Sequence, residues 1–210
     1  MFKILVLLVL FITTIGFAES STKELGTFLH CDGKEEERIE AAHSVKRMNP
    51  HRLEIHWLHG TKIFADEPPY DEDLDGVRWT YCDYKPAQKL YFLQKADKGL
   101  FTGVLLNETT GKILDAGEEI VISPIAQLFF ASRQPDGMDG QEWFVFNMDG
   151  TIQWQGTSET DHYFEPSWNS KGELQAKFSC ASGEAKDSWK RVTLTKSGSN
   201  WTWLPAIPCN

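Results

Sequence analysis

Basic side chains are scarce in this chain. It has 21 Lys and Arg against 30 Asp and Glu, a formal net charge of −9. Nucleic-acid binding needs a basic face that displaces counterions from phosphates, and anionic lipid attracts the same kind of face. The composition therefore argues against both partners. Acidity either keeps an exported protein in solution or steers a basic protein partner toward it.

Long apolar runs are also missing, except at the N-terminus. Residues 4–12 are continuously apolar behind Lys3, and Gly16 and Ala18 are small residues at the positions that signal peptidase recognises. A membrane-spanning helix needs about 20 apolar residues, more than this run has. We therefore expect residues 1–18 to be a cleaved signal peptide. Residues 19–210 should form one β-rich domain in the periplasm or outside the cell, with no membrane insertion after cleavage.

No catalytic motif stands out. The sequence has no G-x-S-x-G nucleophile elbow and no C-x-x-C pair for zinc or redox chemistry. His56 and His59 are three apart on a predicted strand, so their side chains point to opposite faces. The sequence thus favours a binding protein over an enzyme.

A repeated pattern follows Lys89. A strand, a glycine turn and a returning strand occur at residues 104–114, 145–154 and 192–201, with turn glycines Gly111, Gly150 and Gly198. Two further strands precede each hairpin, so each unit is predicted to hold four short strands. Self-similarity over roughly 40–50 residues is typical of β units that bury their apolar faces against one another.

We predict an all-β, antiparallel, partial β-propeller-like fan of about three four-stranded units, at about 77–117, 118–157 and 160–204. An N-terminal hairpin over residues 53–65 should precede them, and one short helix is expected within 33–48. A closed ring needs four or more blades. One sheet edge should therefore stay open to another chain, or be closed by the N-terminal segment.

Residues 77–204 resemble β-propeller repeats at the level of single blades, without the repeated Trp-Asp and Gly-His punctuation of the Trp-Asp repeat family. Partial propeller-like folds are found among periplasmic immunity proteins that block cell-wall-degrading effectors, and this chain is similar to them. The resemblance implies a protein-binding module that inhibits a secreted enzyme. No residue-level motif supports it, so it implies no site residues.

Four cysteines in an exported chain of this size indicate disulfides. They are Cys31, Cys82, Cys180 and Cys209, and three connectivities are possible. A bridge from Cys180 to Cys209 would tie down the C-terminal tail. Cys31 would then join the N-terminal segment to the first unit through Cys82.

An acidic motif precedes the first unit. Asp71, Asp73 and Asp75, followed by Gly76, alternate carboxylates as a Ca²⁺ loop does. However, Cys82 stands where an EF-hand would have its bidentate Glu. The motif is therefore either a non-EF Ca²⁺ site, the single candidate cofactor, or an acidic surface loop.

Two groups of residues are candidates for partner binding. The loops at 66–75 and 133–142 leave different units and carry carboxylates that suit a basic partner, namely Asp66, Glu67, Asp136 and Asp139. Trp201 and Trp203 share one face of the last predicted strand. Both indoles therefore belong to the core, or both are exposed anchors for a protein or a sugar.

Overall fold

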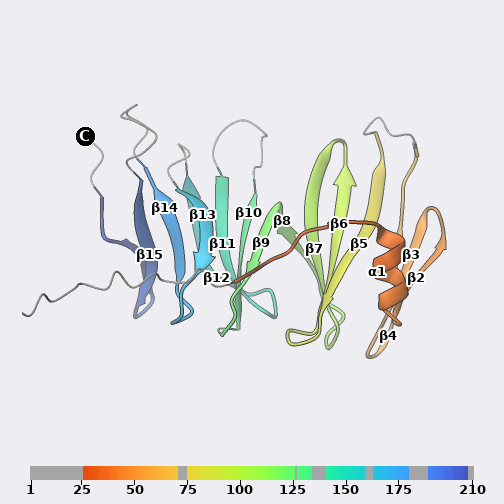
Figure 1. Cartoon of the computed structure of the whole chain (residues 1–210), viewed down its shortest axis with the longest axis horizontal. Coiled ribbons are helices and arrows are strands. Elements are labelled where there is room, and N and C mark those ends of the chain that lie inside the picture. The colour runs from red at the N-terminus through yellow and green to blue at the C-terminus, as the bar shows by residue number, and fades with distance from the viewer. Residues whose placement is uncertain are drawn as a thin grey trace, which may run out of the picture.

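The computed structural model describes residues 26–70, 75–125, 127–133, 141–158, 163–179 and 189–207. In this part of the chain the strands form four antiparallel sheets, which stand in a row in chain order (Figure 1). One short helix, α1 (Glu35–Ala41), lies at the end of the row beside the first sheet. The predicted all-β antiparallel fold, which fits a partial propeller, is confirmed.

Consecutive strands form each sheet. The first sheet has β2 (Val45–Asn49), β3 (Arg52–Trp57) and β4 (Gly60–Ala65). The second has β5 (Val77–Lys85), β6 (Leu90–Asp97), β7 (Leu100–Asn107) and β8 (Ile113–Gly117). The third has β9 (Glu119–Ile122), β10 (Leu128–Arg133), β11 (Gln141–Asn147) and β12 (Ile152–Ser158), with β1 (Thr27–Phe28) added beside β9. The fourth has β13 (Tyr163–Trp168), β14 (Leu174–Phe178), β15 (Lys190–Ser197) and β16 (Asn200–Leu204).

The core consists of three apolar layers, one between each pair of neighbouring sheets. In strand β6 apolar residues follow one another and do not alternate with polar ones. Leu90 and Phe92 belong to the layer shared with the third sheet, whereas Tyr91 and Leu93 belong to the layer shared with the first sheet. Because successive side chains of a strand point to opposite faces, a sheet covered on both faces needs apolar residues at every position.

The two ends of the strands form different rims. At one rim, here called the turn rim, the hairpin turns of the first three sheets interlock. The Leu58 N–H donates to the Glu108 carbonyl (3.4 Å), and Lys112 Nζ donates to the Asp149 carbonyl (2.9 Å). At the opposite rim, here called the loop rim, β4, β6, β10 and β14 end (Figure 1). The connections from one sheet to the next also leave the loop rim.

The N-terminal segment runs from the third sheet past the second to α1 (Figure 1). It begins as β1 on the edge of β9, where the Leu29 N–H donates to the Ile120 carbonyl (3.0 Å). A disulfide then joins Cys31 to Cys82 of β5, across 51 residues of sequence. We call residues 27–41 the strap. It covers one edge of the third sheet, at β9, and one edge of the second sheet, at β5.

Two sequence-based expectations differ from the structure. The helix covers only seven residues, because Val45–Asn49 is a strand rather than the end of a helix. Val45 is buried opposite Ile55 while Lys46 is exposed, which is the alternation of a sheet. The expected N-terminal hairpin is therefore a three-stranded sheet. Among the described residues no helix is both long and apolar enough to cross a membrane.

Candidate functional site

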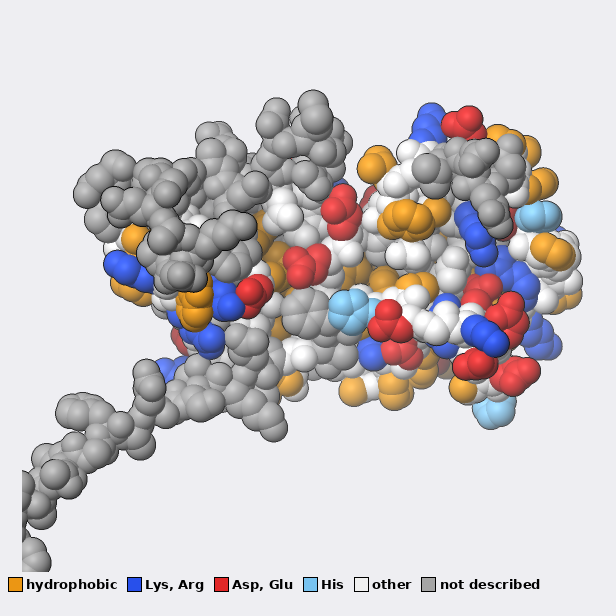
Figure 2. Space-filling view, turned by 45° about the horizontal axis from the view of Figure 1, so that its top comes forward, with side chains coloured by type: hydrophobic (Ala, Val, Ile, Leu, Met, Phe, Trp, Pro, Cys, Tyr) orange, Lys and Arg blue, Asp and Glu red, His pale blue; other side chains and the backbone are white. Residues whose placement is uncertain are grey.

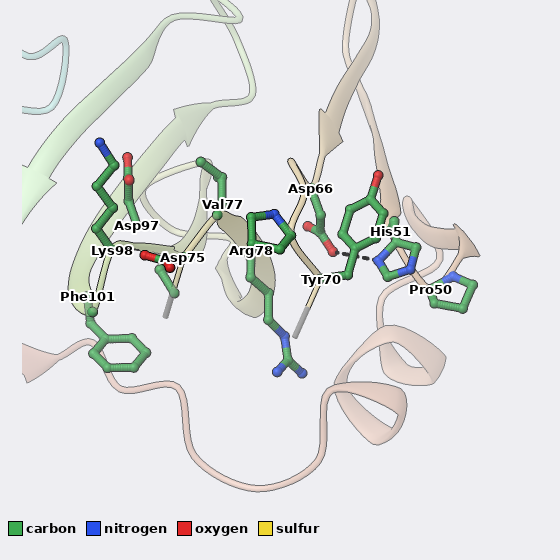
Figure 3. Close-up of a pocket in the computed structure, with 14 residues that line it drawn as sticks. Pro50, His51, Asp66, Tyr70, Asp75, Val77, Arg78, Asp97, Lys98 and Phe101 are labelled. Carbon is green, nitrogen blue, oxygen red and sulfur yellow. Dashed lines mark ion pairs between the residues drawn. The ribbon is translucent and has the colours of Figure 1, made fainter. Parts of the chain in front are cut away.

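A cavity of about 460 Å³ lies at the loop rim between the first and second sheets (Figure 3). One wall is formed by His51, in the turn between β2 and β3, and by Tyr70. The opposite wall is formed by Lys98 and Phe101, where β6 turns into β7, and Arg78 of β5 projects between the walls. The stacking of two sheets thus brings together side chains from three separate segments.

Asp66, which follows β4, is the buried anchor of the first wall. Its side chain is 6% exposed. One carboxylate oxygen accepts a hydrogen bond from the Trp79 N–H (2.8 Å), and the other lies 3.6 Å from His51 Nδ1 and 4.0 Å from Arg47 Nη1. A buried carboxylate is tolerated only with such partners. The group is therefore engaged inside the molecule rather than presented to a partner at the surface.

Aromatic rings line both walls of the cavity. The Tyr70 ring stacks on the His51 ring with centroids 3.8 Å apart. Tyr70 is 55% exposed and Phe101 is 53% exposed, although large apolar side chains usually lie inside a protein. His51 thus lies between the Asp66 carboxylate and the Tyr70 ring, and the two stacked rings form one aromatic surface.

Charged groups of both signs surround these rings. Arg78, Lys98 and Asp75 are exposed, and none of them forms an ion pair within 4.0 Å in the described part of the chain. Asp97 is paired with Lys95 (2.6 Å), and this hydrogen bond lowers the pKa of Asp97. The cavity mouth therefore has cationic hydrogen-bond donors and carboxylate acceptors side by side.

Gly76 closes the base of the acidic loop beside the cavity. The Glu67 and Val77 backbones exchange two hydrogen bonds, of 2.9 and 3.1 Å. At Gly76 φ is +131°, and an added Cβ would lie 2.5 Å from the carbonyl oxygens of Glu67 and Pro69. Only glycine fits such a close approach in this conformation. The loop therefore starts and ends at one fixed point of the rim.

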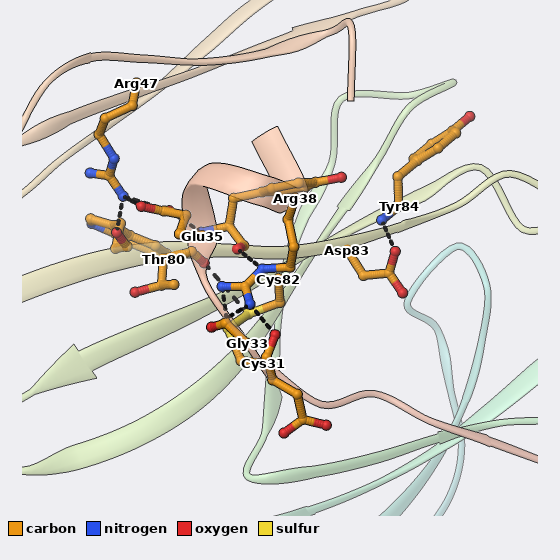
Figure 4. The surroundings of a disulfide bond; sticks show 12 residues. Cys31, Gly33, Glu35, Arg38, Arg47, Thr80, Cys82, Asp83 and Tyr84 are labelled. Atoms are coloured by element: carbon orange, nitrogen blue, oxygen red, sulfur yellow. Dashed lines mark hydrogen bonds and ion pairs between the residues drawn. A yellow bond between two sulfur atoms is a disulfide. The ribbon is translucent and has the colours of Figure 1, made fainter. Parts of the chain in front are cut away.

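Charged side chains cap the free edge of β5 (Figure 4). Glu35 accepts from the Tyr81 N–H (2.6 Å), and Arg38 donates to the Tyr81 carbonyl (3.0 Å). Two residues earlier in the strand, Arg47 donates to the Trp79 carbonyl (2.6 Å) and also to both oxygens of Glu35 (2.7 and 2.8 Å). With these groups satisfied, the edge of β5 is closed to strand addition.

No protein-family model matches this sequence, and comparisons with curated proteins and with solved structures find no match either. The resemblance to propeller repeats and to periplasmic immunity proteins therefore stays a prediction. The function has to be argued from the site itself.

The predicted site residues lie in different environments, and some of them are outside the described part of the chain. The Cys31–Cys82 pairing is present, whereas Cys180 and Cys209 lie outside the described residues. Asp66 is buried, and Glu67 is exposed at the base of the loop. Asp75 lines the cavity. Four predicted residues lie outside the described part of the chain: Asp71, Asp73, Asp136 and Asp139.

The calcium hypothesis accordingly remains a prediction. Within the described residues no three His, Cys, Asp or Glu side chains gather as a metal site.

Trp201 and Trp203 are core residues rather than exposed anchors. Both are partly buried against the apolar layer between the third and fourth sheets. The Trp203 ring stacks on Tyr163 (4.9 Å) and meets Trp143 and Trp154 edge-on (6.0 and 5.9 Å). The shared face inferred from their spacing therefore points inward.

Sequence reasoning missed most of the cavity. His51, Tyr70, Arg78 and Phe101 carry no motif, and they come from parts of the chain that meet only after two sheets have stacked. One signal was available. Tyr70 and Phe101 are aromatic residues beside turns, where polar residues are usual.

Proposed function

We propose that this protein is an exported binding module that captures a protein partner at the loop rim of its first two sheets. The observation that carries the proposal is the exposure of Met48 (56%) and Leu100 (54%), one on each of these sheets. Apolar side chains exposed on a soluble protein mark interaction sites when they cluster with aromatic and Arg side chains. Tyr70, Phe101 and Arg78 line the cavity at the same rim of these two sheets.

Closed edges favour recognition by side chains. The strap covers the edges of β5 and β9, so a partner cannot pair with these strands while the strap is in place. Loops at a rim can vary without disturbing the sheets, whereas the interlocked turn rim has little such freedom. This difference supports the loop rim as the recognition surface.

The negative net charge of this chain favours a basic partner. We propose that this partner is a secreted enzyme, which the protein inhibits. Without Lys3 of the signal peptide, the mature chain carries 20 basic and 30 acidic side chains. Attraction over such distances mainly raises the association rate and is screened within about 8–10 Å at physiological salt. Binding should therefore weaken as the salt concentration rises.

Photo-crosslinking in envelope extract tests the proposed surface. A crosslinking amino acid replaces Met48 or Leu100 in one pair of variants, and Ile113 or Ile152 of the turn rim in a control pair of similar exposure. We expect one discrete adduct from the loop-rim positions and none from the turn-rim positions. Equal adducts from both rims would contradict the proposal.

A second experiment addresses the acidic loops. Asn replaces five carboxylates together in a pull-down from the same extract: Asp71, Asp73, Asp75, Asp136 and Asp139. The partner should be lost, or bound with a weaker salt dependence. An unchanged partner and an unchanged salt dependence would remove both loops from the recognition surface.

A further inference from the structure

The loop-rim cavity has the size of a small-molecule site. Its volume of about 460 Å³ falls in the range of roughly 300–1,000 Å³ that is typical of ligand pockets. Its first wall is supported from inside the molecule. The Trp79 N–H donates to the Asp66 carboxylate, whose other oxygen lies 3.6 Å from His51 Nδ1, and the Tyr70 ring stacks on the His51 ring.

The lining combines two kinds of surface. Tyr70 and Phe101 present half-exposed rings from opposite walls (Figure 3), and the face of an aromatic ring is electronegative. Among the other lining residues, Arg78 and Lys98 are donors only, whereas Asp75 and Asp97 are acceptors only when ionised. A matching ligand needs weakly positive C–H faces toward the rings and groups that both accept and donate hydrogen bonds at its edge.

We infer that this cavity binds an uncharged saccharide unit. A sugar ring has C–H groups on its faces and hydroxyl groups around its edge, and each hydroxyl both donates and accepts. It therefore satisfies the donors and the acceptors of the cavity at once. The cavity shares the loop rim with the protein contact proposed above. The two are distinguished by Met48 and Leu100, which lie outside the cavity lining.

The charges themselves argue against an ionic ligand. An anion would meet Asp75 and Asp97 beside the cations, and a cation would meet Arg78 and Lys98 beside the carboxylates. Arg78, Lys98 and Asp75 are also exposed, and ion pairs at exposed positions contribute only about 0–1 kcal/mol. A neutral ligand avoids repulsion from either set and finds hydrogen-bond donors and acceptors in the same lining.

The test uses the full mature protein. Immobilised neutral trisaccharides of glucose, galactose, mannose and N-acetylglucosamine are screened beside charged trisaccharides of glucuronate and glucosamine and a set of free amino acids. The strongest neutral ligand is then titrated by calorimetry. We expect a neutral trisaccharide to bind, and Phe101→Ala and Tyr70→Ala each to weaken its binding at least tenfold.

Leu100→Ala is the matched control, since Leu100 is the neighbour of Phe101, has almost the same exposure and does not line the cavity. The affinity of this variant for the trisaccharide should stay within about twofold of the parent. With the crosslinking amino acid at Met48, the same substitution should lower the yield of the partner adduct. The inference is overturned if no neutral trisaccharide binds, if only charged sugars or amino acids bind, or if Phe101→Ala and Leu100→Ala behave alike. A melting temperature for each variant separates loss of binding from loss of folding.

Discussion

At the scale of single residues, the site depends on a few positions that accept only one side chain. Gly76 is one of them. Its positive φ and the two carbonyl oxygens 2.5 Å from a hypothetical Cβ leave room only for hydrogen. Asp66 is another, because its buried carboxylate serves a backbone N–H, His51 and Arg47 at the same time.

Gly76→Ala should lower the free energy of unfolding by about 1–3 kcal/mol, because the methyl group combines a left-handed backbone with a steric clash. Urea unfolding measures the loss. Gly33→Ala is the control, since Gly33 also has positive φ (+73°) but no atom within 4 Å of the added Cβ. Equal losses for the two variants would show that the close approach at Gly76 has no effect on stability.

Tyr84 predicts an alkaline limit to stability. Burial, together with the hydrogen bond to Glu108 (2.6 Å) and the charge of that carboxylate, raises the pKa of Tyr84 to about 12. An unfolded tyrosine ionises near pH 10. From about pH 10 to 12 the unfolded chain therefore loses this proton while the folded chain keeps it, and the free energy of unfolding falls as the pH rises.

Replacing Glu108 tests this assignment. Glu108→Gln removes the negative charge, so the tyrosinate absorbance of the folded protein should appear at lower pH than in the parent. Glu36→Gln, at an exposed position of α1, should leave the titration curve unchanged. A Glu108→Gln curve that overlays the parent would refute the role of this carboxylate.

At the scale of elements, α1 and the strap finish the second sheet. The helix has no fully buried residue, and only Ile39 packs against the apolar layer of the first two sheets. Its position therefore depends largely on polar contacts and on the disulfide. Glu35 and Arg38 satisfy the edge of β5 where another strand would otherwise pair. A seven-residue helix is marginal alone, and tertiary contacts must hold it.

Glu35→Ala should destabilise the protein by about 2 kcal/mol or more. It leaves the Arg47 guanidinium without its bidentate partner and the Tyr81 N–H without an acceptor, in a partly buried position. Chemical denaturation gives the measurement. Glu36→Ala, one residue away and exposed, should change stability by less than about 0.5 kcal/mol. Similar values for both variants would argue against an edge-capping role.

At the scale of the whole molecule, an acidic chain is covered along two sheet edges and has the connections between its sheets at one rim. In the first sheet, buried Leu53 and Ile55 of β3 alternate with the polar residues Glu54 and His56. The outer face of this strand is therefore polar, as in terminal repeats.

We predict that the protein is exported and that its four cysteines are oxidised. The intact mass of material recovered from the periplasm or medium should correspond to residues 19–210 and be four hydrogens below that of the fully reduced chain. Two disulfides would account for this difference, one of them Cys31–Cys82. Retention of residues 1–18, or labelling of all four cysteines by a thiol reagent in the native protein, would contradict it.

Much of the fold was predictable because its signals are local. Turn glycines such as Gly111 and Gly150 adopt positive φ at the positions that the repeat indicates. The apolar runs around Phe92 and Val145 are buried strands. Strand periodicity and turn chemistry act over a few residues, so they can be recognised in a single sequence.

The helix end was harder to predict. Val45 is buried opposite Ile55 of β3, a contact that no local pattern reveals. The sequence also left open whether Trp203 faces the core, because its partners belong to the layer between the third and fourth sheets.

By itself, the sequence determined the strand pattern, the acidity and the expectation of an exported chain, because each depends on composition or on near neighbours. The tertiary structure alone decided which groups meet at the loop rim. The Asp66 carboxylate lies beside Arg47 and His51, while Tyr70 and Phe101 line opposite walls of a cavity between two sheets. Such contacts join residues tens of positions apart, and their geometry follows from the way the sheets stack rather than from any local preference.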